Sequence, residues 1–547
     1  MTEVATQVTF AEAIARAVAA EGATDVFGIM GSGNMRVLHH LEHDLEVAYH
    51  AARHEAGAMA AADGFSRATG RVGVCIVTQG PGLTNTITPL ITARKANSPL
   101  VLLTGDSSGI RTPEDPFARV QAVSYETLFA AADVPVVRAE PATAARDVHA
   151  AFAKAARDLT PVALVMPYEH EVAEAADAPV VAAETPVPVE PEAGELDAAA
   201  ERLCEAQGPL VLAGRGAFRA GAADALRELA DELGAVLGTS LPASGLFRGH
   251  PADLGLVGGF ARPSVQDAVN ACDVVLAVGA GLNAFTTHQE TLMADAHVIH
   301  VDRDPAAFGR HRGASSTITG DARLVAEALL ARVRARDGVA SSVRQVAEVV
   351  AALGRPRSDP FEDETTPGLL DPRALCGRLD ALLPSDRAVV TDGGRFVSHV
   401  VRRVHPESPD ALLYMQEFGS VGGGLGAAVG AALGRPDRLT ALFVGDSGIM
   451  MTLGDLDIAI REHVTMLVVV MNDQALGSEI TLLGGAGLDV RDAYMRTPDL
   501  AAVARAMGAE GLRIESLDQL DALPDRLARL RGPLLLDCRV MRDGVGI

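Results

Sequence analysis

The stretch Leu439–Glu479, LTALFVGDSGIMMTLGDLDIAIREHVTMLVVVMNDQALGSE, indicates the fold of its part of the chain. The apolar run Leu439–Val444 predicts a buried strand, which the glycine-containing turn 445–448 ends. We expect Thr452–His463 to be a helix and Met466–Met471 to be a second strand. Strand, turn, helix and strand in this order predict a parallel sheet, in which both strand ends and the start of the helix face one crevice.

One carboxylate follows each of these two strands. Asp446 and Asp473 lie at opposite ends of the unit, 27 residues apart (473 − 446 = 27). Mg²⁺ prefers oxygen ligands and is often held by one or two carboxylates together with phosphate oxygens. The free backbone amides at the start of a helix suit such a phosphate. An ordinary strand–helix–strand unit with carboxylates in its turns is the alternative.

Gly445-Asp446-Ser447 and Asn472-Asp473 resemble the motif of the thiamine-diphosphate (ThDP) enzymes, which is GDG followed further along the chain by NN. Ser stands for the third Gly of this motif and Asp for its second Asn. Because Asp is also an oxygen ligand, the metal site should persist with one more negative charge. The resemblance implies that Mg²⁺ is held by Asp446, Asp473 and the Ala475 carbonyl, with the diphosphate on the turn and helix start at Gly445, Ser447, Gly448 and Ile449.

A second resemblance lies in the first third of the chain. RHEAGAMAAADGFSRATG at 53–70 and TQGPGLTN at 78–85 are similar to the pyrimidine-binding signature of acetolactate-synthase-like ThDP enzymes. The resemblance implies that Glu55 hydrogen-bonds a ring nitrogen of the cofactor's aminopyrimidine and so helps to remove the thiazolium proton. A surface glutamate that caps a helix is the alternative. Strands at Arg71–Thr78 and Pro99–Thr104, with a helix at Leu83–Ala96 between them, repeat the order seen above.

Four further residues are candidates for the catalytic site. Ser32 lies where benzoylformate-decarboxylase-like members of the family carry a serine. Gln79 lies in the tight turn 79–82, and Gln121 falls in a segment that resembles the one facing the active site in the family. Glu479 falls where pyruvate decarboxylases carry a second catalytic glutamate. Each has an ordinary alternative: a turn serine, a turn or surface glutamine, and a carboxylate near the positive end of a helix.

Two glycine-rich segments of the last third are expected to contact the cofactor. By resemblance, the turn after strand Ala388–Thr391 faces the diphosphate through Gly394 and Arg395. In EFGSVGGGLG at 417–426, the resemblance assigns the carbonyl of Gly419 to the cofactor's amino group. The same resemblance makes Val421 the apolar support that bends the cofactor. Leu482–Leu488, with its glycines, is a candidate mobile lid.

The 547 residues are too many for one core and predict several domains. Alternating strands and helices favour an α/β protein with three doubly wound parallel-sheet domains. We expect a pyrimidine-binding domain at 1–171, a central Rossmann-like domain at 192–335 and a diphosphate- and Mg²⁺-binding domain at 368–547, joined by linkers at 172–191 and 358–366. In the family the central domain is structural or binds FAD or a nucleotide. FAD is doubtful here because 281–285 lacks the arginine of flavin-binding members.

Composition excludes several other classes of protein. The formal charge of −24 argues against nucleic acid as a partner, and no long uncharged apolar stretch suggests a membrane span. Met1-Thr2-Glu3 does not resemble the start of a signal peptide. The five cysteines, without a CxxC pattern, are expected to be buried thiols in a reducing cytoplasm.

Three functions are compatible with these patterns. The first is an acetolactate-synthase-like carboligase that uses a 2-oxo acid donor. The second is a non-ligating 2-oxo acid decarboxylase or an aldehyde or acyloin lyase, and the third is a ThDP-binding subunit without catalysis. In the family, the glutamate and the metal site of one active site come from different subunits. The resemblance therefore implies a homodimer or homotetramer.

Overall fold

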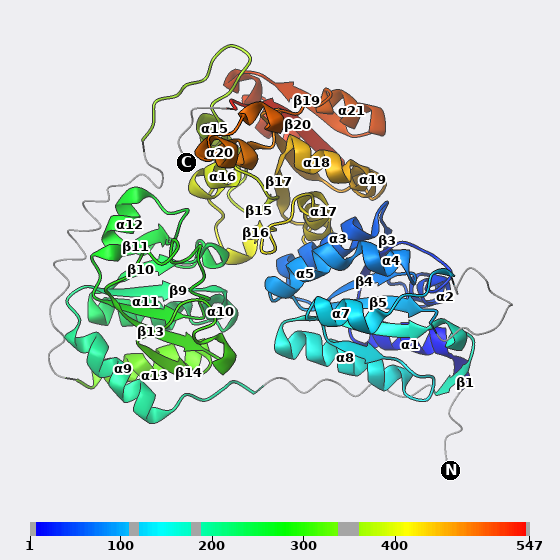
Figure 1. Ribbon diagram of the computed structural model, residues 1–547, viewed down its shortest axis with the longest axis horizontal. Coiled ribbons are helices and arrows are strands. Elements are labelled where there is room, and N and C mark those ends of the chain that lie inside the picture. Colours follow the sequence, from blue (N-terminus) through cyan, green and yellow to red (C-terminus); the bar gives the residue numbers. More distant parts are fainter. Residues whose placement is uncertain (1–6, 109–119, 177–186, 337–359, 543–547) are drawn as a thin grey trace. The chain divides into compact units, whose positions relative to one another are not determined.

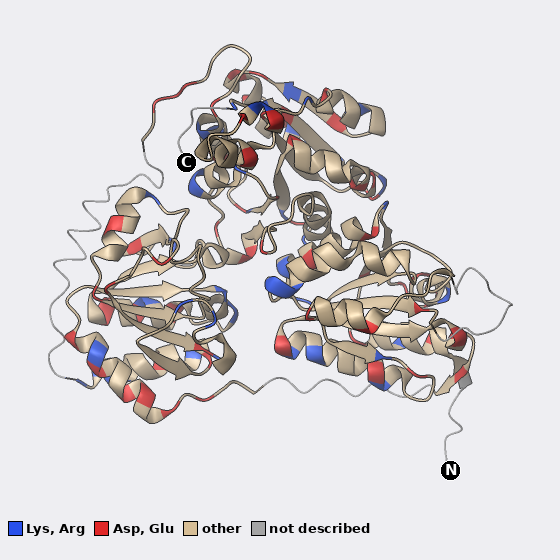
Figure 2. Ribbon diagram, viewed as in Figure 1, with Lys and Arg blue, Asp and Glu red and all other residues tan. Residues whose placement is uncertain are grey.

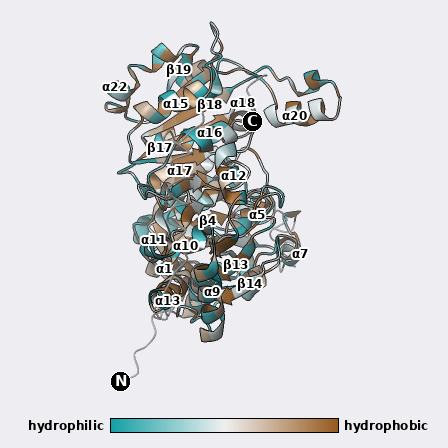
Figure 3. Ribbon diagram, turned by 90° about the vertical axis from the view of Figure 1, so that its left-hand side faces the viewer, coloured by the Kyte–Doolittle hydropathy of each residue, from teal (hydrophilic) through white to brown (hydrophobic). Residues whose placement is uncertain are grey.

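The computed structural model describes residues 7–108, 120–176, 187–336 and 360–542 (Figure 1). The chain forms two compact units: one combines the N-terminal and C-terminal segments, and the other holds the central segment. Three six-stranded parallel sheets confirm the predicted α/β class. Charged residues lie mainly on helices and loops, whereas the strands are largely uncharged (Figure 2). Strands near the labels β17 and β18 are coloured hydrophobic in Figure 3.

The N-terminal sheet has the order β3-β2-β4-β5-β7-β6. Its strands are β2 (Asp25–Gly28), β3 (Ala48–Ala51), β4 (Gly73–Val77), β5 (Leu100–Asp106), β6 (Val136–Arg138) and β7 (Pro161–Pro167). Its helices are α1 (Phe10–Ala20), α2 (Met35–His39), α3 (Glu55–Thr69), α4 (Pro81–Asn85), α5 (Ile87–Lys95), α7 (Tyr125–Ala131) and α8 (Ala144–Asp158). Strand β1 (Gln7–Thr9) precedes these elements in the chain and β8 (Glu174–Ala176) follows them, and the two form a separate antiparallel pair.

Helices cover both faces of this sheet. Val74 and Ile76 of β4 pack in one core with α1 and α8, whereas Cys75 and Val77 pack in a second core with α3, α5 and α7. Successive side chains of a strand point to opposite faces, so a continuous apolar run is what a strand buried on both faces requires. The doubly wound prediction is therefore confirmed for this domain.

The C-terminal sheet has the order β16-β15-β17-β18-β20-β19. Its strands are β15 (Arg387–Thr391), β16 (Leu412–Tyr414), β17 (Leu439–Gly445), β18 (Met466–Asn472), β19 (Glu510–Ile514) and β20 (Pro533–Arg539). Its helices are α15 (Pro372–Leu382), α17 (Gly424–Gly434), α18 (Asp446–Thr452), α19 (Leu456–Arg461), α20 (Gly477–Gly485), α21 (Leu500–Met507) and α22 (Leu523–Leu527), whereas α16 (Val397–Arg403) falls almost wholly in the unit that holds the central segment. When the strands of each domain are numbered along the chain, both terminal sheets read 2-1-3-4-6-5. The two domains thus share one topology.

Helices α3 and α17 join these two domains through direct backbone contact. An ideal Cβ on Gly430 would lie 1.8 Å from the carbonyl oxygen of Ala61, and one on Gly64 would lie 2.0 Å from that of Ala427. Any side chain at either glycine would force the helices apart. The small-residue composition of both helices is therefore a packing requirement, and one apolar core runs through α3, α17 and both sheets.

The central unit contains a sheet of order β11-β10-β9-β12-β13-β14. Its strands are β9 (Pro209–Ala213), β10 (Val236–Thr239), β11 (Asp253–Leu256), β12 (Val274–Val278), β13 (His297–Asp302) and β14 (Ser316–Thr319). Its helices are α9 (Ala193–Glu205), α10 (Arg215–Arg219), α11 (Ala223–Leu233), α12 (Pro263–Asn270) and α13 (Ala322–Arg334). This is the 3-2-1-4-5-6 order of a Rossmann-like sheet, as the sequence predicted.

Some boundaries differ from the prediction. The turn expected at 445–448 is the start of a helix, α18, which begins at Asp446 after an extended N-cap at Gly445, and the helix expected at Thr452–His463 is observed as the shorter α19. The helix expected at Leu83–Ala96 divides at Thr86 into α4 and α5. Residues 177–186 of the first linker and residues 358–359 of the second lie outside the described ranges.

The expectation that all cysteines are buried holds for three of them. All five are free thiols; Cys75, Cys376 and Cys538 are buried, whereas Cys204 and Cys272 are half-buried. Within the described residues, no helix combines the length and the apolar character needed to cross a membrane.

Candidate active site

Asp446 and Asp473 lie side by side at the carboxyl edge of the C-terminal sheet. Strands β17 and β18 are paired so that Gly445 is opposite Met471, and each carboxylate comes directly after one of the two strands. Burial raises the pKa of Asp446 to about 7, and the charge of Asp473 adds to this rise. Burial also raises the pKa of Asp473 to about 6, against the opposing charge of Arg395. A bound cation would stabilise the ionised form of two buried carboxylates that repel each other.

The surrounding polar groups also fit a metal ion with a phosphate ligand. Oδ2 of Asp446 and Oγ of Ser447 are buried, and neither has a hydrogen-bond partner in the described part of the chain. The amide of Ala475 donates to Oδ1 of Asp473 over 3.1 Å, so Ala475 follows closely on the second carboxylate. Nη2 of Arg395 lies 3.5 Å from Oδ2 of Asp473. Oxygen donors with a neighbouring cationic side chain are the donor set that Mg²⁺ and a diphosphate require.

The glycine turn 419–422 is held by a buried carboxylate. The amide of Gly422 donates to Oδ1 and Oδ2 of Asp392 over 3.0 and 2.9 Å, and the amide of Gly424 donates to Oδ1 over 3.3 Å. Burial raises the pKa of Asp392 to about 6, although these amide hydrogen bonds act in the opposite direction. Asp392 follows β15 and therefore anchors the turn to the same edge of the sheet that carries Asp446.

Val421 and Gly394 also lie at this edge. An ideal Cβ on Gly393 would come within 3.1 Å of Val421, and one on Gly448 within 3.2 Å of the same side chain. The side chain of Val421, which is 41% exposed, thus lies between the turn after β15 and the start of α18. Gly394 has a φ of +148°, and a Cβ there would meet the ring of Phe396 at 2.7 Å. Gly419, with a φ of +78°, is exposed.

Glu55 is the first residue of α3 and is half-buried. The side-chain amide of Asn85, the last residue of α4, donates to its carboxylate over 2.9 Å. His54 caps the helix by accepting a hydrogen bond from the amide of Ala56 over 3.1 Å. The helix is therefore capped by the histidine, and the Glu55 carboxylate is oriented by Asn85.

Ser32, Gln79 and Gln121 form one hydrogen-bonded group. Nε2 of the buried Gln79 donates to Oγ of Ser32 over 3.0 Å and to Oε1 of Gln121 over 2.9 Å. Oε1 of Gln79 accepts from the Thr78 hydroxyl over 2.7 Å. Because Gln79 follows β4, the group lies at the carboxyl edge of the N-terminal sheet. The structure thus brings together three candidates that lie far apart in the sequence.

Glu479 and the expected lid lie in one helix. Glu479 is exposed and falls in the first turn of α20. Leu482 and the two glycines after it belong to the same helix, so most of the segment expected to be a lid is helical. In the described part of the chain, no hydrogen bond joins the Glu479 side chain to Asp446 or Asp473.

Two residues at the site were not predicted from the sequence. The sequence places Asp392 in the turn after strand Ala388–Thr391. Its position directly after a buried strand and before two glycines is the pattern that could have indicated a role at the site. Asn85 closes the TQGPGLTN stretch, six residues after Gln79 (85 − 79 = 6). Its partner Glu55 lies 30 residues away in the sequence, and no local pattern indicates that pairing.

The central domain offers no comparable polar cluster at 281–285. Oδ1 of Asn283 accepts hydrogen bonds from the amides of Phe285 and Thr286 over 3.1 and 3.0 Å, so the segment closes on itself. Phe285 is 62% exposed.

The site thus combines a buried carboxylate pair and an anchored glycine turn on one α/β domain with a helix-terminal glutamate on a second domain of the same topology. Comparison with known proteins identifies the family. Residues 8–123 match the thiamine pyrophosphate enzyme N-terminal TPP binding domain, residues 196–329 its central domain, and residues 392–538 its C-terminal TPP binding domain. Thiamine pyrophosphate is another name for ThDP.

Individual relatives are similar over almost the whole chain. The chain is 29% identical to the acetolactate synthase isozyme 2 large subunit of Escherichia coli over 540 residues, 96% of this chain and 94% of that protein. It is 31% identical to the probable 2-ketoarginine decarboxylase AruI of Pseudomonas aeruginosa over 537 residues, 94% of this chain and 90% of that protein. The acetolactate synthase large subunit of Parasynechococcus marenigrum is 29% identical over 560 residues, 97% of this chain and 87% of that protein. The chain belongs to the acetolactate-synthase-like family of ThDP enzymes.

Proposed function

We propose that the protein is a ThDP- and Mg²⁺-dependent carboligase that takes a 2-oxo acid as donor and forms a C–C bond next to its carbonyl carbon. The observation that carries this proposal is the buried pair Asp446 and Asp473, in which burial and mutual repulsion favour a bound cation. Several relatives carry the name acetolactate synthase, and these names support the carboligase over other reactions.

The residues of the C-terminal domain bind the cofactor in this proposal. Asp446, Asp473 and the carbonyl of Ala475 hold Mg²⁺. Arg395, which already lies beside Asp473, adds positive charge next to the diphosphate. When bound, ThDP supplies a stabilised carbanion for chemistry at a carbonyl carbon. Val421 would support the cofactor with its apolar side chain, and the carbonyl of Gly419 would accept a hydrogen bond from the cofactor's amino group.

Glu55 is the proposed proton-handling group of the N-terminal domain. Its carboxylate would hydrogen-bond a ring nitrogen of the aminopyrimidine, and the side-chain amide of Asn85 orients that carboxylate. In the proposal, the Glu55 of one subunit completes the site that contains the Asp446 of another. This arrangement requires at least a homodimer, and we propose a homodimer or homotetramer located in the cytoplasm.

The group of Ser32, Gln79 and Gln121 is proposed to orient the substrate. Gln79 uses its side-chain amide to fix both partners, so the hydroxyl hydrogen of Ser32 and the side-chain amide of Gln121 remain donors. Neutral donors of this kind suit the carbonyl or carboxylate oxygens of a 2-oxo acid. Glu479 is kept as a candidate proton donor at the exposed start of α20.

The test is CO₂ release by the purified protein from a panel of 2-oxo acids, with ThDP and Mg²⁺. Each assay is run with and without an aldehyde or a second 2-oxo acid as acceptor, and products are identified by mass. CO₂ together with a new C–C-bonded product is the expected result. CO₂ with only free aldehyde would overturn the carboligase and favour the decarboxylase, to which the similarity with AruI also points. Absence of CO₂ from every acid would contradict both.

A further inference from the structure

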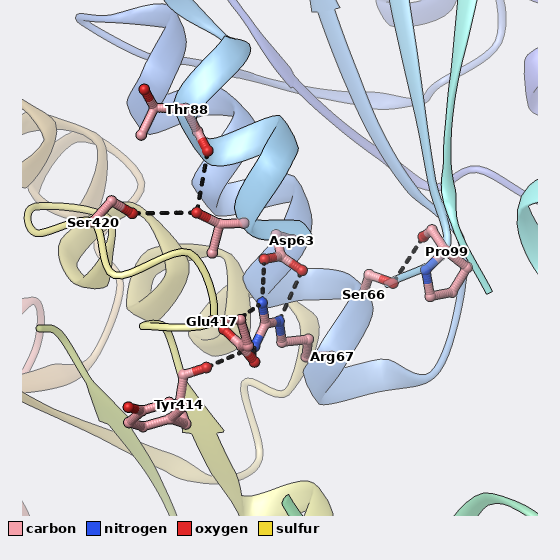
Figure 4. Close-up of polar contacts among 9 residues, drawn as sticks. Asp63, Ser66, Arg67, Thr88, Pro99, Tyr414, Glu417 and Ser420 are labelled. Carbon is pink, nitrogen blue, oxygen red and sulfur yellow. Dashed lines mark hydrogen bonds and ion pairs between the residues drawn. The ribbon is translucent and has the colours of Figure 1, made fainter. Parts of the chain in front are cut away.

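Arg67 is buried in the last turns of α3, the helix that begins at Glu55, and its side chain is only 6% exposed. Its guanidinium donates to both carboxylate oxygens of Asp63 over 2.9 and 2.7 Å. It donates to both carboxylate oxygens of Glu417 over 2.6 and 3.3 Å, and to the carbonyl of Tyr414 over 2.7 Å (Figure 4). These five hydrogen bonds use all five N–H groups of the guanidinium.

The partners of Arg67 belong to two different parts of the chain. Asp63 lies one turn away on α3 itself, whereas Tyr414 ends β16 and Glu417 lies two residues before Gly419. Arg67 therefore ties the helix that carries Glu55 to the segment that leads into the glycine turn 419–422. The ion pair between Arg67 and Glu417 connects residues that are 350 positions apart.

A second helix of the N-terminal domain holds the same segment. The hydroxyl of Thr92, on α5, lies 3.2 Å from Oγ of Ser420, which is inside the glycine turn (Figure 4). The ammonium of Lys95, also on α5, lies 5.7 Å from the ring centre of Phe418. The segment from 414 to 420 is thus held from α3 and α5 at several points, with Arg67 making most of the hydrogen bonds.

The charges of Asp63 and Glu417 favour the ionised form of the buried Arg67. Burial alone would lower the pKa of the Arg67 guanidinium, but the charges of Asp63 and Glu417 more than reverse this and raise that pKa. Bidentate pairs between arginine and carboxylate fix geometry as well as charge. Loss of one partner would leave a buried charge without its counter-charge. The link between helix and turn is therefore rigid.

We propose that Arg67 is a positioning residue of the cofactor site, which fixes the glycine turn 419–422 of its own chain. Arg67 acts through Glu417 and the carbonyl of Tyr414, without touching the cofactor. The inference rests on the proposed function, in which the carbonyl of Gly419 binds the amino group of the aminopyrimidine. Arg67 holds this carbonyl in place, because Gly419 follows its ion-pair partner Glu417 by two residues.

Two variants separate this role from a general contribution to stability. Glu417→Gln removes the charge that links Arg67 to the turn, and Asp63→Asn removes the other carboxylate, which lies on the same helix as Arg67. Both changes take one counter-charge from Arg67 and keep the shape of the side chain. Arg67→Lys is a third variant, because lysine keeps the positive charge and loses the planar fork.

The measurements are ThDP binding by titration calorimetry, with Mg²⁺ and the full-length apo protein, and the near-ultraviolet circular dichroism of the bound aminopyrimidine. Both Glu417→Gln and Asp63→Asn are expected to lower the melting temperature. Only Glu417→Gln and Arg67→Lys are expected to weaken ThDP binding, by about tenfold or more, and to change the circular dichroism. Asp63→Asn is expected to bind ThDP within about twofold of the wild type.

Wild-type binding and circular dichroism in both Glu417→Gln and Arg67→Lys would overturn the proposal. Equal weakening by Glu417→Gln and Asp63→Asn would also overturn it, since the effect would then follow stability alone. The wild-type titration separates this failure from a failure of the proposed function. If the wild type binds no ThDP, the cofactor site itself is wrong, whereas normal binding in all variants contradicts only the role of Arg67.

Discussion

The side-chain amide of Asn85 donates a hydrogen bond to the carboxylate of Glu55 over 2.9 Å. The two residues lie at facing helix ends, Asn85 at the end of α4 and Glu55 at the start of α3. Because a hydrogen bond to a charged group contributes about 1.5–3 kcal/mol, its loss should affect the orientation of Glu55 measurably. Asn85 therefore enters the proposed mechanism as the residue that orients the glutamate.

We predict that Asn85→Ala lowers kcat by about tenfold to a hundredfold, since each 1.4 kcal/mol of lost stabilisation corresponds to a factor of ten. The folded state should be little changed, because Asn85 is exposed. Steady-state kinetics at saturating ThDP, together with the melting temperature, check this. A variant with the wild-type kcat would show that Glu55 does not depend on Asn85.

For Glu55→Gln we predict that ThDP still binds while turnover collapses. Glutamine keeps the size of the side chain and one acceptor oxygen, but it cannot share a proton with the ring nitrogen in the same way. Titration calorimetry measures binding and product formation measures turnover. Glu479→Gln is a useful comparison, because Glu479 is the other carboxylate considered for proton transfer. Rates near the wild type in Glu55→Gln would contradict the role assigned to Glu55.

The sequence predicted the carboxylate pair and the three sheets because the signals for both are local. Continuous apolar runs such as Met466–Met471 mark strands buried on both faces, and Asp446 and Asp473 directly follow two such runs. Helix α18 was not predicted because Gly-Asp-Ser-Gly has the composition of a turn. In the structure Gly445 is the N-cap residue of α18, with an extended backbone (φ −73°, ψ 156°), and the helix begins at the next residue, Asp446.

Contacts between distant side chains could not be predicted in this way. Gln79 meets Ser32 across 47 positions and Gln121 across 42, and Arg67 meets Glu417 across 350. Nothing in the spacing of the glycines of α3 and α17 indicates that Gly430 lies on Ala61. Side-chain pairing of this kind depends on how the sheets are placed, which only the folded chain shows.

The carboxylate pair predicts a strict dependence on a divalent cation. We expect chelation of Mg²⁺ to release ThDP, and Asp446→Ala to prevent Mg²⁺-dependent ThDP binding, because Asp446 supplies a buried oxygen without a protein partner. Retained binding of ThDP in excess chelator would contradict the assignment. Calorimetric titration of ThDP at several Mg²⁺ concentrations measures both effects, and Asp457→Ala, at an exposed ion pair on α19, is a control on the same domain.

Asp455 predicts a pH dependence of stability. Both of its carboxylate oxygens are buried, and neither has a hydrogen-bond partner among the described residues. Burial raises the pKa of Asp455 from 3.8 to about 6, although the charge of His54 opposes the rise. In the unfolded chain the carboxyl ionises at its ordinary pKa. The free energy of unfolding should therefore fall as the pH rises from about 4 to about 6, by about 3 kcal/mol.

Asp455→Asn lacks this titration. Relative to the wild type, the variant should gain stability progressively between about pH 4 and pH 6, and the difference should be constant above that range. Urea unfolding of both proteins at a series of pH values measures the difference, in which the contributions of other titrating groups largely cancel. A difference that does not change with pH would show that Asp455 ionises normally in the folded protein.

Gln79 is the centre of the proposed substrate-orienting group, and its replacement should affect the donor acid more than the cofactor. Gln79→Leu keeps the approximate volume of a buried side chain and removes the amide that holds Ser32 and Gln121. These two side chains should then lose their fixed orientation, which raises the KM for the 2-oxo acid by about tenfold, while the affinity for ThDP stays near that of the wild type. Ser32→Ala removes one donor only and should have a smaller effect. Steady-state kinetics with several donor acids, and ThDP titrations in parallel, check both variants. A change in ThDP affinity as large as the change in KM would place the group at the cofactor instead of the substrate.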